Sequence, residues 1–168
     1  MKVLRALVAV ALLAVAVFVG YRFVAHPVPD ETGRSVAIYY VKPESDALGK
    51  WSVSLSPKAS GTDSAAFYAT AQVLAGPPAE RHAVRFPPGT IVRSVHVSDT
   101  TATVDLGGAV ASPQSGSYGE SGEFKALVWT LTSLSGITAV RVKVDGARVS
   151  TLPGGHLELD EPLTRKSF

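Results

Sequence analysis

The segment from Gly116 to Gly122, GSYGESG, is the part of the chain most suggestive of chemistry, because serines and a glutamate lie among glycines. A serine nucleophile on a sharp strand-to-helix turn requires the spacing G-x-S-x-G, which this segment lacks, and a polar loop precedes it. A phosphate-binding loop would end in Gly-Lys-Ser or Gly-Lys-Thr, and this one does not. We therefore interpret the segment as a flexible loop leading into a capped helix, with no catalytic role.

Metal binding and paired acid–base chemistry also lack a supporting pattern. None of the four histidines has another histidine or a carboxylate three or four residues away on an expected helix, so we predict no metal site. Glu120 and Glu123 are expected to flank the start of a helix, where carboxylates stabilise the positive end of its dipole. Glycoside hydrolysis would need two carboxylates that converge in a cleft. Hydrolysis of wall material is thus the weakest alternative, and we predict no cofactor and no enzyme. The histidines are His26, His82, His96 and His156.

Cysteine content and charge exclude further classes. The chain of 168 residues has no cysteine, which rules out disulfides, zinc–thiolate sites and thiol catalysis. It has 16 basic and 14 acidic side chains, but Lys2, Arg5 and Arg22 precede residue 26, where no acidic residue occurs. The remainder therefore has 13 basic against 14 acidic side chains. Because no cluster of basic residues interleaved with aromatic residues remains, we predict no nucleic-acid partner.

The segment from Leu4 to Ala25 is almost entirely apolar, with Arg5 and Arg22 near its ends. As a helix its length would be roughly 33 Å, enough to cross a hydrocarbon layer of about 30 Å. Lys2 and Arg5 favour a cytoplasmic N-terminus and an extracytoplasmic domain. No A-x-A cleavage spacing follows, so we predict a cytoplasmic stub and an uncleaved transmembrane signal anchor at 1–25, with a cleaved signal peptide as the alternative.

The rest of the chain is expected to be a linker, one globular domain and a short tail. Residues 26–34, HPVPDETGR, combine prolines, a glycine and mixed charges, as a short semi-rigid spacer does. The domain is expected at 35–165 and the tail at 166–168. Because the linker is short, we expect the domain to stay close to the outer face of the cell membrane, in the periplasm or at the cell surface.

Hydrophobic periodicity within 35–165 predicts both strands and helices. The first helix is expected to start with Thr62 or Asp63 as its cap and to stop at Gly76, and the second carries an apolar stripe from Phe124 to Leu134. Strands are expected at 35–41, 51–55, 91–97, 101–106 and 140–144, with a short return strand at 148–151 and polar loops at 42–50 and 107–122.

The resulting order, β(β)αββαβ(β), mixes strands and helices without strict alternation and so does not indicate a doubly wound sheet. We predict an α+β fold in which one mixed β-sheet carries two helices on one face. The segment 35–41, SVAIYYV, is apolar on both faces and is expected to be an interior strand. A hairpin is expected around Ser98-Asp99-Thr100, and Asp145-Gly146 predicts a tight turn.

Six short motifs, in order, resemble the GerMN domain, a module named after the sporulation and spore-germination protein GerM. The resemblance covers about residues 35 to 165. The motifs are VLAGP at 73–77, FPPGT at 86–90, ATVDL at 102–106, LVWTLT at 127–132, VDG at 144–146 and GHLELDEPLTR at 155–165. The motif positions, expected to be mainly structural, are Leu74, Gly76, Pro77, Pro88, Gly89, Thr90, Asp105, Thr130, Asp145, Gly146, Pro162 and Arg165.

This resemblance implies a non-enzymatic α+β module of bacterial envelopes, similar to the ring-building motifs of secretion-type assemblies. For spore formers it implies support of an envelope-spanning complex and of spore cortex formation. GerM-like proteins often have two tandem domains and a lipid-modified cysteine, whereas this chain has one expected domain and no cysteine. Single-domain members also resemble proteins of bacteria that make no spores.

Several motif residues have physical explanations of their own. Asp105 lies on the face of its strand opposite to Ala102, Val104 and Leu106, where it can pair with a base or cap neighbouring amides. The hydroxyls of Thr130 and Thr132 are expected to bond back to their helix backbone. Arg165 is expected to fold onto a carboxylate and hold the tail.

Two functional hypotheses remain. The first is a scaffold module that presents a sheet face or edge to envelope proteins near the membrane. The second is a module that binds peptidoglycan or another anionic polymer of the cell wall, using the loop at 107–122 together with Arg81, Arg85 and Arg93.

Overall fold

The computed structural model describes residues 35–43, 45–55, 59–112 and 116–168. The expected membrane anchor and linker, residues 1–34, lie outside the described residues. Within the described ranges, no helix is long and apolar enough to cross a bilayer. The described residues belong to one compact unit, Thr32–Phe168.

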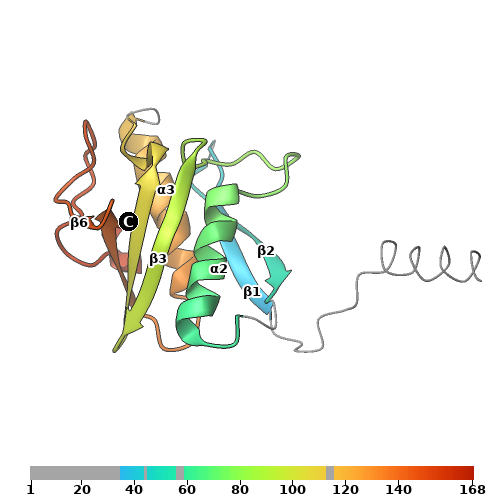
Figure 1. The fold of residues 1–168 in the computed structure, drawn as a ribbon. Coiled ribbons are helices and arrows are strands. Elements are labelled where there is room, and N and C mark those ends of the chain that lie inside the picture. The colour runs from blue at the N-terminus through green and yellow to red at the C-terminus, as the bar shows by residue number, and fades with distance from the viewer. Residues whose placement is uncertain (1–34, 44, 56–58, 113–115) are drawn as a thin grey trace, which may run out of the picture. The chain divides into compact units, whose positions relative to one another are not determined.

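The order of elements agrees with the predicted order β(β)αββαβ(β), and the α+β class is confirmed (Figure 1). Two short 3₁₀ helices, η1 and η2, are added to it. The elements are β1 (Ser35–Val41), β2 (Leu48–Ser54), α2 (Thr62–Ala75), β3 (Thr90–Ser98), β4 (Thr101–Gly108), η1 (Ala109–Ala111), α3 (Gly116–Leu131), β5 (Ala139–Val144), β6 (Ala147–Arg148) and η2 (Arg165–Ser167).

The strands form two sheets, so the prediction of a single mixed sheet was wrong. β1 and β2 make an antiparallel pair, while the larger sheet has the order β3-β4-β5-β6. β4 and β5 are parallel and the other two pairs of the larger sheet are antiparallel, which makes this sheet mixed. Because β4 and β5 run parallel, they need a long crossover, and α3 lies within it.

β1 is buried as predicted, but it is not an interior strand. Within the part of the chain that the structure describes, it pairs with β2 alone, and helix and loop atoms cover its other edge instead of a third strand. The Tyr39 N–H donates to Thr130 Oγ1 at 2.9 Å, and the Val84 N–H donates to the Val41 carbonyl at 2.9 Å. A sheet edge needs its backbone groups satisfied, and a covering helix does this as well as another strand does.

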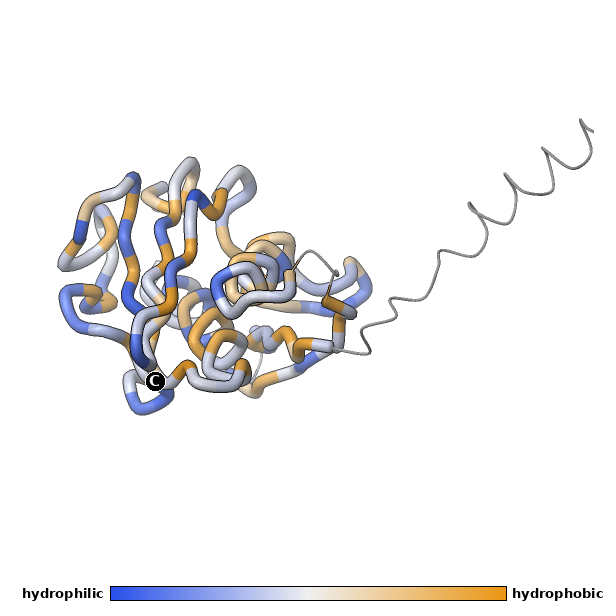
Figure 2. The backbone as a smooth tube through the Cα atoms, turned by 60° about the horizontal axis from the view of Figure 1, so that its bottom comes forward, coloured by the Kyte–Doolittle hydropathy of each residue, from blue (hydrophilic) through white to orange (hydrophobic). Residues whose placement is uncertain are grey.

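The two helices pack on different sheets and share one hydrophobic core. α2 lies alongside β3, whereas α3 packs mainly on β1 (Figure 1). The alternation of apolar and polar residues along the strands appears as orange and blue segments in Figure 2. The inward-facing side chains of β4, together with Val140 and Val142 of β5, are fully or almost fully buried, as are Phe124, Leu127 and Leu131 on α3.

The predicted loop at 107–122 is largely regular structure. β4 continues to Gly108, η1 follows, and α3 begins at Gly116, eight residues before the apolar stripe. Serine and glycine have low helix propensity, and for this reason the pattern indicated a loop, but burial of this turn overrides that preference. Similarly, the predicted loop at 42–50 ends early, because β2 begins at Leu48.

Candidate functional site

The first motif residues lie where two backbone segments approach each other closely. Gly76 ends α2 with φ 75° and ψ 171°, a conformation that is essentially restricted to glycine. Beside it, Arg85 donates from Nη2 to the Pro77 carbonyl at 2.8 Å. Pro77 is buried, and Leu74 packs against the core. These residues therefore hold the end of α2 to the segment that leads into β3.

The FPPGT motif forms the turn into β3. Gly89 follows the exposed Pro88 with φ 91°, and its carbonyl accepts the Ala109 N–H at 3.2 Å. The Thr90 N–H donates to the Pro87 carbonyl at 3.0 Å. Within the described residues, the buried Thr90 Oγ1 has no hydrogen-bond partner. The turn thereby joins the start of β3 to η1.

Asp105 connects three strands of the larger sheet. Its Oδ1 accepts the Gly146 N–H at 2.8 Å, and its Oδ2 lies 3.5 Å from Arg93 Nε. Arg93 also donates from Nη1 to Asp145 Oδ1 at 3.2 Å. Asp145 and Gly146 both have positive φ, 50° and 81°, as a two-residue hairpin turn requires. Asp105 thus pairs with a base and caps an amide, and both contacts stabilise the turn between β5 and β6.

Thr130 is fully buried and bonds to another element. Its Oγ1 accepts the Tyr39 N–H of β1, whereas the neighbouring Thr132 Oγ1 donates back to the Val128 carbonyl of α3 at 2.7 Å. The expected bond to the helix backbone is therefore found at Thr132, and Thr130 connects α3 to the edge of β1.

Replacing Thr130 by valine is expected to lower the free energy of unfolding by about 1–3 kcal/mol, because the shape is retained while the part-buried Tyr39 N–H loses its acceptor. Chemical denaturation followed by tryptophan fluorescence measures this change. Thr130→Ser keeps the oxygen and loses one methyl group, so its cost should stay near about 1 kcal/mol. An equal loss in both variants would contradict a role for this hydrogen bond.

The C-terminal motif holds the last residues onto the domain. After Pro162, Leu163 exchanges two backbone hydrogen bonds with Val140 of β5, at 2.7 and 2.8 Å. Among the described residues, the partners of Arg165 are a hydroxyl and an aromatic ring and not the predicted carboxylate: its Nε donates to Thr132 Oγ1 at 2.9 Å, and its guanidinium lies 5.7 Å from the Trp129 ring centre. The expected tail at 166–168 is also packed, with Phe168 edge-on to the same tryptophan.

The arginines of the wall-polymer hypothesis are engaged separately. Arg81 donates to the Lys50 carbonyl at 3.1 Å and lies over the Tyr40 ring. Arg85 bonds to the carbonyl at the end of α2, and Arg93 pairs with the two aspartates of the larger sheet. Each of the three guanidinium groups is therefore already engaged within the domain, and Arg85 Nη2 also lies 3.5 Å from the Arg81 carbonyl oxygen.

A hollow of about 650 Å³ lies between α2 and the outer edge of β3. Phe67, an exposed aromatic residue of α2, and Val95 of β3 are among the residues that line it. At the same junction, Asp63 Oδ1 accepts the Val97 N–H at 2.9 Å and Oδ2 lies 2.9 Å from His96 Nδ1. The pKa of Asp63 is lowered from its ordinary value, mainly by the Val97 N–H and then by the hydrogen bond to His96. Asp63 thus bridges α2 to β3 and does not cap its own helix; the N-cap residue is Gly61.

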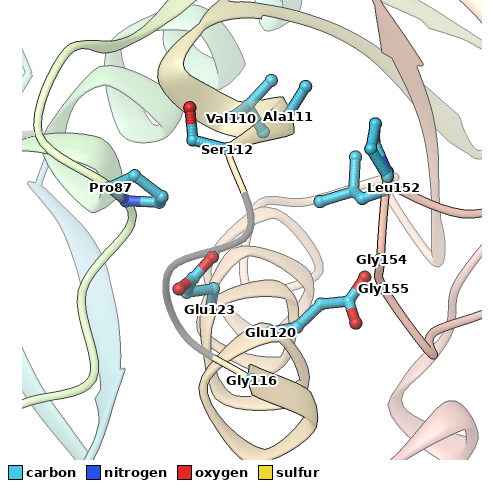
Figure 3. Close-up of a pocket in the computed structure, with 11 residues that line it drawn as sticks. Pro87, Val110, Ala111, Ser112, Gly116, Glu120, Glu123, Leu152, Gly154 and Gly155 are labelled. Carbon is cyan, nitrogen blue, oxygen red and sulfur yellow. The ribbon is translucent and has the colours of Figure 1, made fainter.

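A second, smaller hollow of about 100 Å³ lies over the first turns of α3 (Figure 3). Glu120 and Glu123 contribute to its wall, and both are buried, with 6 % and 3 % exposure. Both lie inside α3, which begins at Gly116 and has no acidic residue in its first turn, so the expectation that they flank the start of the helix was wrong. Within the described residues, no group of three or more histidine, cysteine, aspartate or glutamate side chains is arranged to hold a metal ion.

Sequence and fold comparisons place the domain in a known family. The sequence model of the Germane family, described as sporulation and spore germination, matches residues 37–150, more than half of the chain. The chain belongs to the Germane family. This finding confirms the GerMN resemblance of the motifs. No curated protein matches the sequence.

Solved structures show the same fold. The first GerMN domain of the sporulation protein GerM from Bacillus subtilis has 21% identity and a TM-score of 0.61, over 79% of this chain and 98% of that domain. The tandem GerMN domains of the same protein have 21% identity and a TM-score of 0.64, over 80% of this chain and 47% of the tandem chain. A putative lipoprotein from Clostridium perfringens has 17% identity and a TM-score of 0.57, over 79% of this chain and 88% of the lipoprotein chain. This chain thus spans about half of the tandem structure.

The buried carboxylates are the feature of this Germane domain that sequence reasoning missed. Glu120 and Glu123 precede Leu127 by seven and four residues, so they continue the apolar face of α3 toward its start. That spacing could have placed them inward. Their charge argued for exposure, because carboxylates are almost never fully buried without partners.

Proposed function

We propose that this Germane-family chain is a non-enzymatic protein-interaction or scaffold module of the bacterial cell envelope, linked to sporulation, spore germination or cell-wall assembly. Family membership over residues 37–150 supports the biological context. We further propose that the apolar segment from Leu4 to Ala25 anchors the chain in the cell membrane, with the domain on the extracytoplasmic side. The length and hydrophobicity of that segment support this location.

The main support for an interaction role is the outer edge of β3, which borders the hollow between β3 and α2. Among the described strands, β3 is the last one of the larger sheet, so about half of its backbone groups face away from β4. The Val97 N–H already donates to Asp63 Oδ1, and Val95 lines the hollow. An exposed strand edge is a template for another strand, and Phe67 offers an apolar contact next to it. An extended segment of an envelope protein fits this surface.

The contacts of the motif residues support a non-enzymatic reading. Three polar side chains of the motifs, those of Asp105, Thr130 and Arg165, are each engaged in a contact that holds two elements together. The wall-polymer alternative is less well supported, because the three arginines already bond to groups of the domain itself.

Photo-crosslinking in the native host tests the interaction role. A photoreactive amino acid at Phe67 of the full chain should capture one or a few envelope proteins in the membrane fraction. The matched control is the same substitution at Lys166, which is exposed on η2 next to α3 and should capture none of them. Equal capture from both positions would contradict the proposed surface. Retention on purified wall material without any crosslinked protein would favour the wall-polymer alternative.

A further inference from the structure

The hollow over the first turns of α3 is built around a carboxylate that is only half satisfied. Glu120 Oε2 accepts the backbone N–H groups of His156 and Leu157 at 2.7 and 3.3 Å. The other oxygen, Oε1, is buried and has no hydrogen-bond partner within the described residues. A buried acceptor without a hydrogen-bond partner is unfavourable, so this site favours a bound donor. We call this hollow the Glu120 pocket.

The position of Glu120 depends on a glycine that faces it. A Cβ atom at Gly155 would overlap Glu120 Oε1, so the absence of a side chain there lets the carboxylate reach the segment that follows β6. Figure 3 shows the Glu120 side chain extending toward Gly154 and Gly155. The two backbone bonds to Oε2 then hold the carboxylate in this orientation. The orphan oxygen is therefore held in place before any ligand arrives.

The acidic side chains that line the Glu120 pocket favour a positively charged ligand. The only ionisable side chains among the residues lining the Glu120 pocket are Glu120 and Glu123. Both are more than nine-tenths buried, so the attraction to a positive charge is weakly screened by water. An anionic ligand would be repelled.

The number and type of wall groups favour an ammonium ion over a metal ion. Calcium takes six to eight oxygen ligands, whereas the side-chain oxygens among the residues lining the pocket belong to Glu120, Glu123 and Ser112, and Glu123 has an interaction of its own. An ammonium group needs at most three acceptors. Pro87, Val110 and Leu152 add apolar wall that suits methylene groups. The volume of about 100 Å³ equals that of roughly three liquid water molecules, enough for a short aliphatic stem.

We propose that the Glu120 pocket binds a primary ammonium group carried on a short aliphatic stem. This goes beyond the proposed interaction at β3, because it concerns another surface and is testable without any partner protein. Two sources share this chemistry: a lysine side chain of a protein, and the free amine of a diamino acid in a wall peptide.

Binding is measured by NMR on the full-length protein in detergent micelles, with n-butylammonium as the probe. The backbone amides of Gly155, His156 and Leu157 report on the pocket. We expect saturable shifts of these amides with a dissociation constant of about 1–10 mM, in keeping with the few atoms of the probe. Tetramethylammonium, which has the charge but no N–H donor, and n-butanol, which has no charge, should leave the amides unshifted.

Two variants locate the charge that binds. Glu120→Gln should weaken n-butylammonium binding at least tenfold, whereas Glu158→Gln, which removes the same charge from an exposed neighbouring segment, should not change it. Equal shifts from tetramethylammonium, unchanged binding in Glu120→Gln, or no saturable shift in the wild type would each overturn the proposal. The comparison of the three probes on the wild type decides the matter even if Glu120→Gln does not fold.

The two sources are separated by two further titrations. Nα-acetyl-lysine amide carries the side chain of a protein lysine, and diaminopimelic acid carries the amines of a wall peptide. If the lysine derivative binds more tightly than n-butylammonium, the pocket is assigned to a protein. If diaminopimelic acid binds more tightly than n-butylammonium, the pocket is assigned to a wall peptide. Failure of crosslinking at Phe67 would leave these binding results standing, so the two proposals fail independently.

Discussion

The Phe124→Ala variant is expected to lose about 3–5 kcal/mol of unfolding free energy. Phe124 has no exposed surface and lies near the centre of α3. Its ring is edge-on to Phe86 at a centroid distance of 5.5 Å, so it connects α3 to the segment before β3. Truncation removes buried apolar area and leaves a cavity that the surrounding elements cannot close. A domain of this size is stable by only about 5–15 kcal/mol, so much of its stability would be lost.

Chemical denaturation followed by the fluorescence of the two tryptophans measures this loss. Phe67→Ala removes the same atoms from a side chain that is 41% exposed, and it should cost less than about 1 kcal/mol. The difference between the two phenylalanines tests whether the core, and not ring size alone, sets the effect. Equal losses at the two positions would contradict the described burial.

The Gly108→Ala variant is expected to lose about 2–5 kcal/mol. Gly108 ends β4 with φ 69° and ψ −129°, a conformation that side chains rarely adopt and that costs about 1–3 kcal/mol. A Cβ atom there would also collide with the Gly89 carbonyl oxygen, which accepts the Ala109 N–H. Backbone cannot move aside as a flexible side chain can, so the overlap adds about 1–3 kcal/mol.

Gly136→Ala separates these two causes. Gly136 also has positive φ, 86°, but nothing lies within 4 Å of a Cβ atom built on it. Its cost should stay at about 1–2 kcal/mol, since only strain remains. The measurement is again chemical denaturation. If Gly108→Ala is no more destabilising than Gly136→Ala, the close approach of the two backbone segments does not contribute.

Local patterns predicted the elements well where the deciding interactions are close in sequence. The hairpin between β3 and β4 turns at Asp99 and Thr100, and its strands extend the predicted ones by one or two residues. Asp145 and Gly146 form the predicted tight turn. Gly76 ends α2 as predicted, because a glycine and two following prolines prevent a helix from continuing.

The candidate sites were harder to predict because their partners are distant in sequence. Glu120 is positioned by amides 36 and 37 residues later, and Asp63 by an amide 34 residues later. The sequence pattern of a helix cap identifies Asp63 as a polar residue at a helix start. It does not show that the Asp63 carboxylate accepts a hydrogen bond from the backbone of β3. For the same reason, Arg165 was assigned a carboxylate while its actual partners are a hydroxyl and an aromatic ring.

By itself, the sequence determined the order of strands and helices, the main turns and the family, because these depend on periodicity, on glycine and proline positions and on short motifs. Only the tertiary structure decided that β1 and β2 form a separate sheet, that Thr130 covers the edge of β1, and that two glutamates lie inside. Pairing between strands depends on which backbone groups are already satisfied, and burial of a charge depends on amides supplied from elsewhere in the chain. Neither condition can be read from the residues next to it.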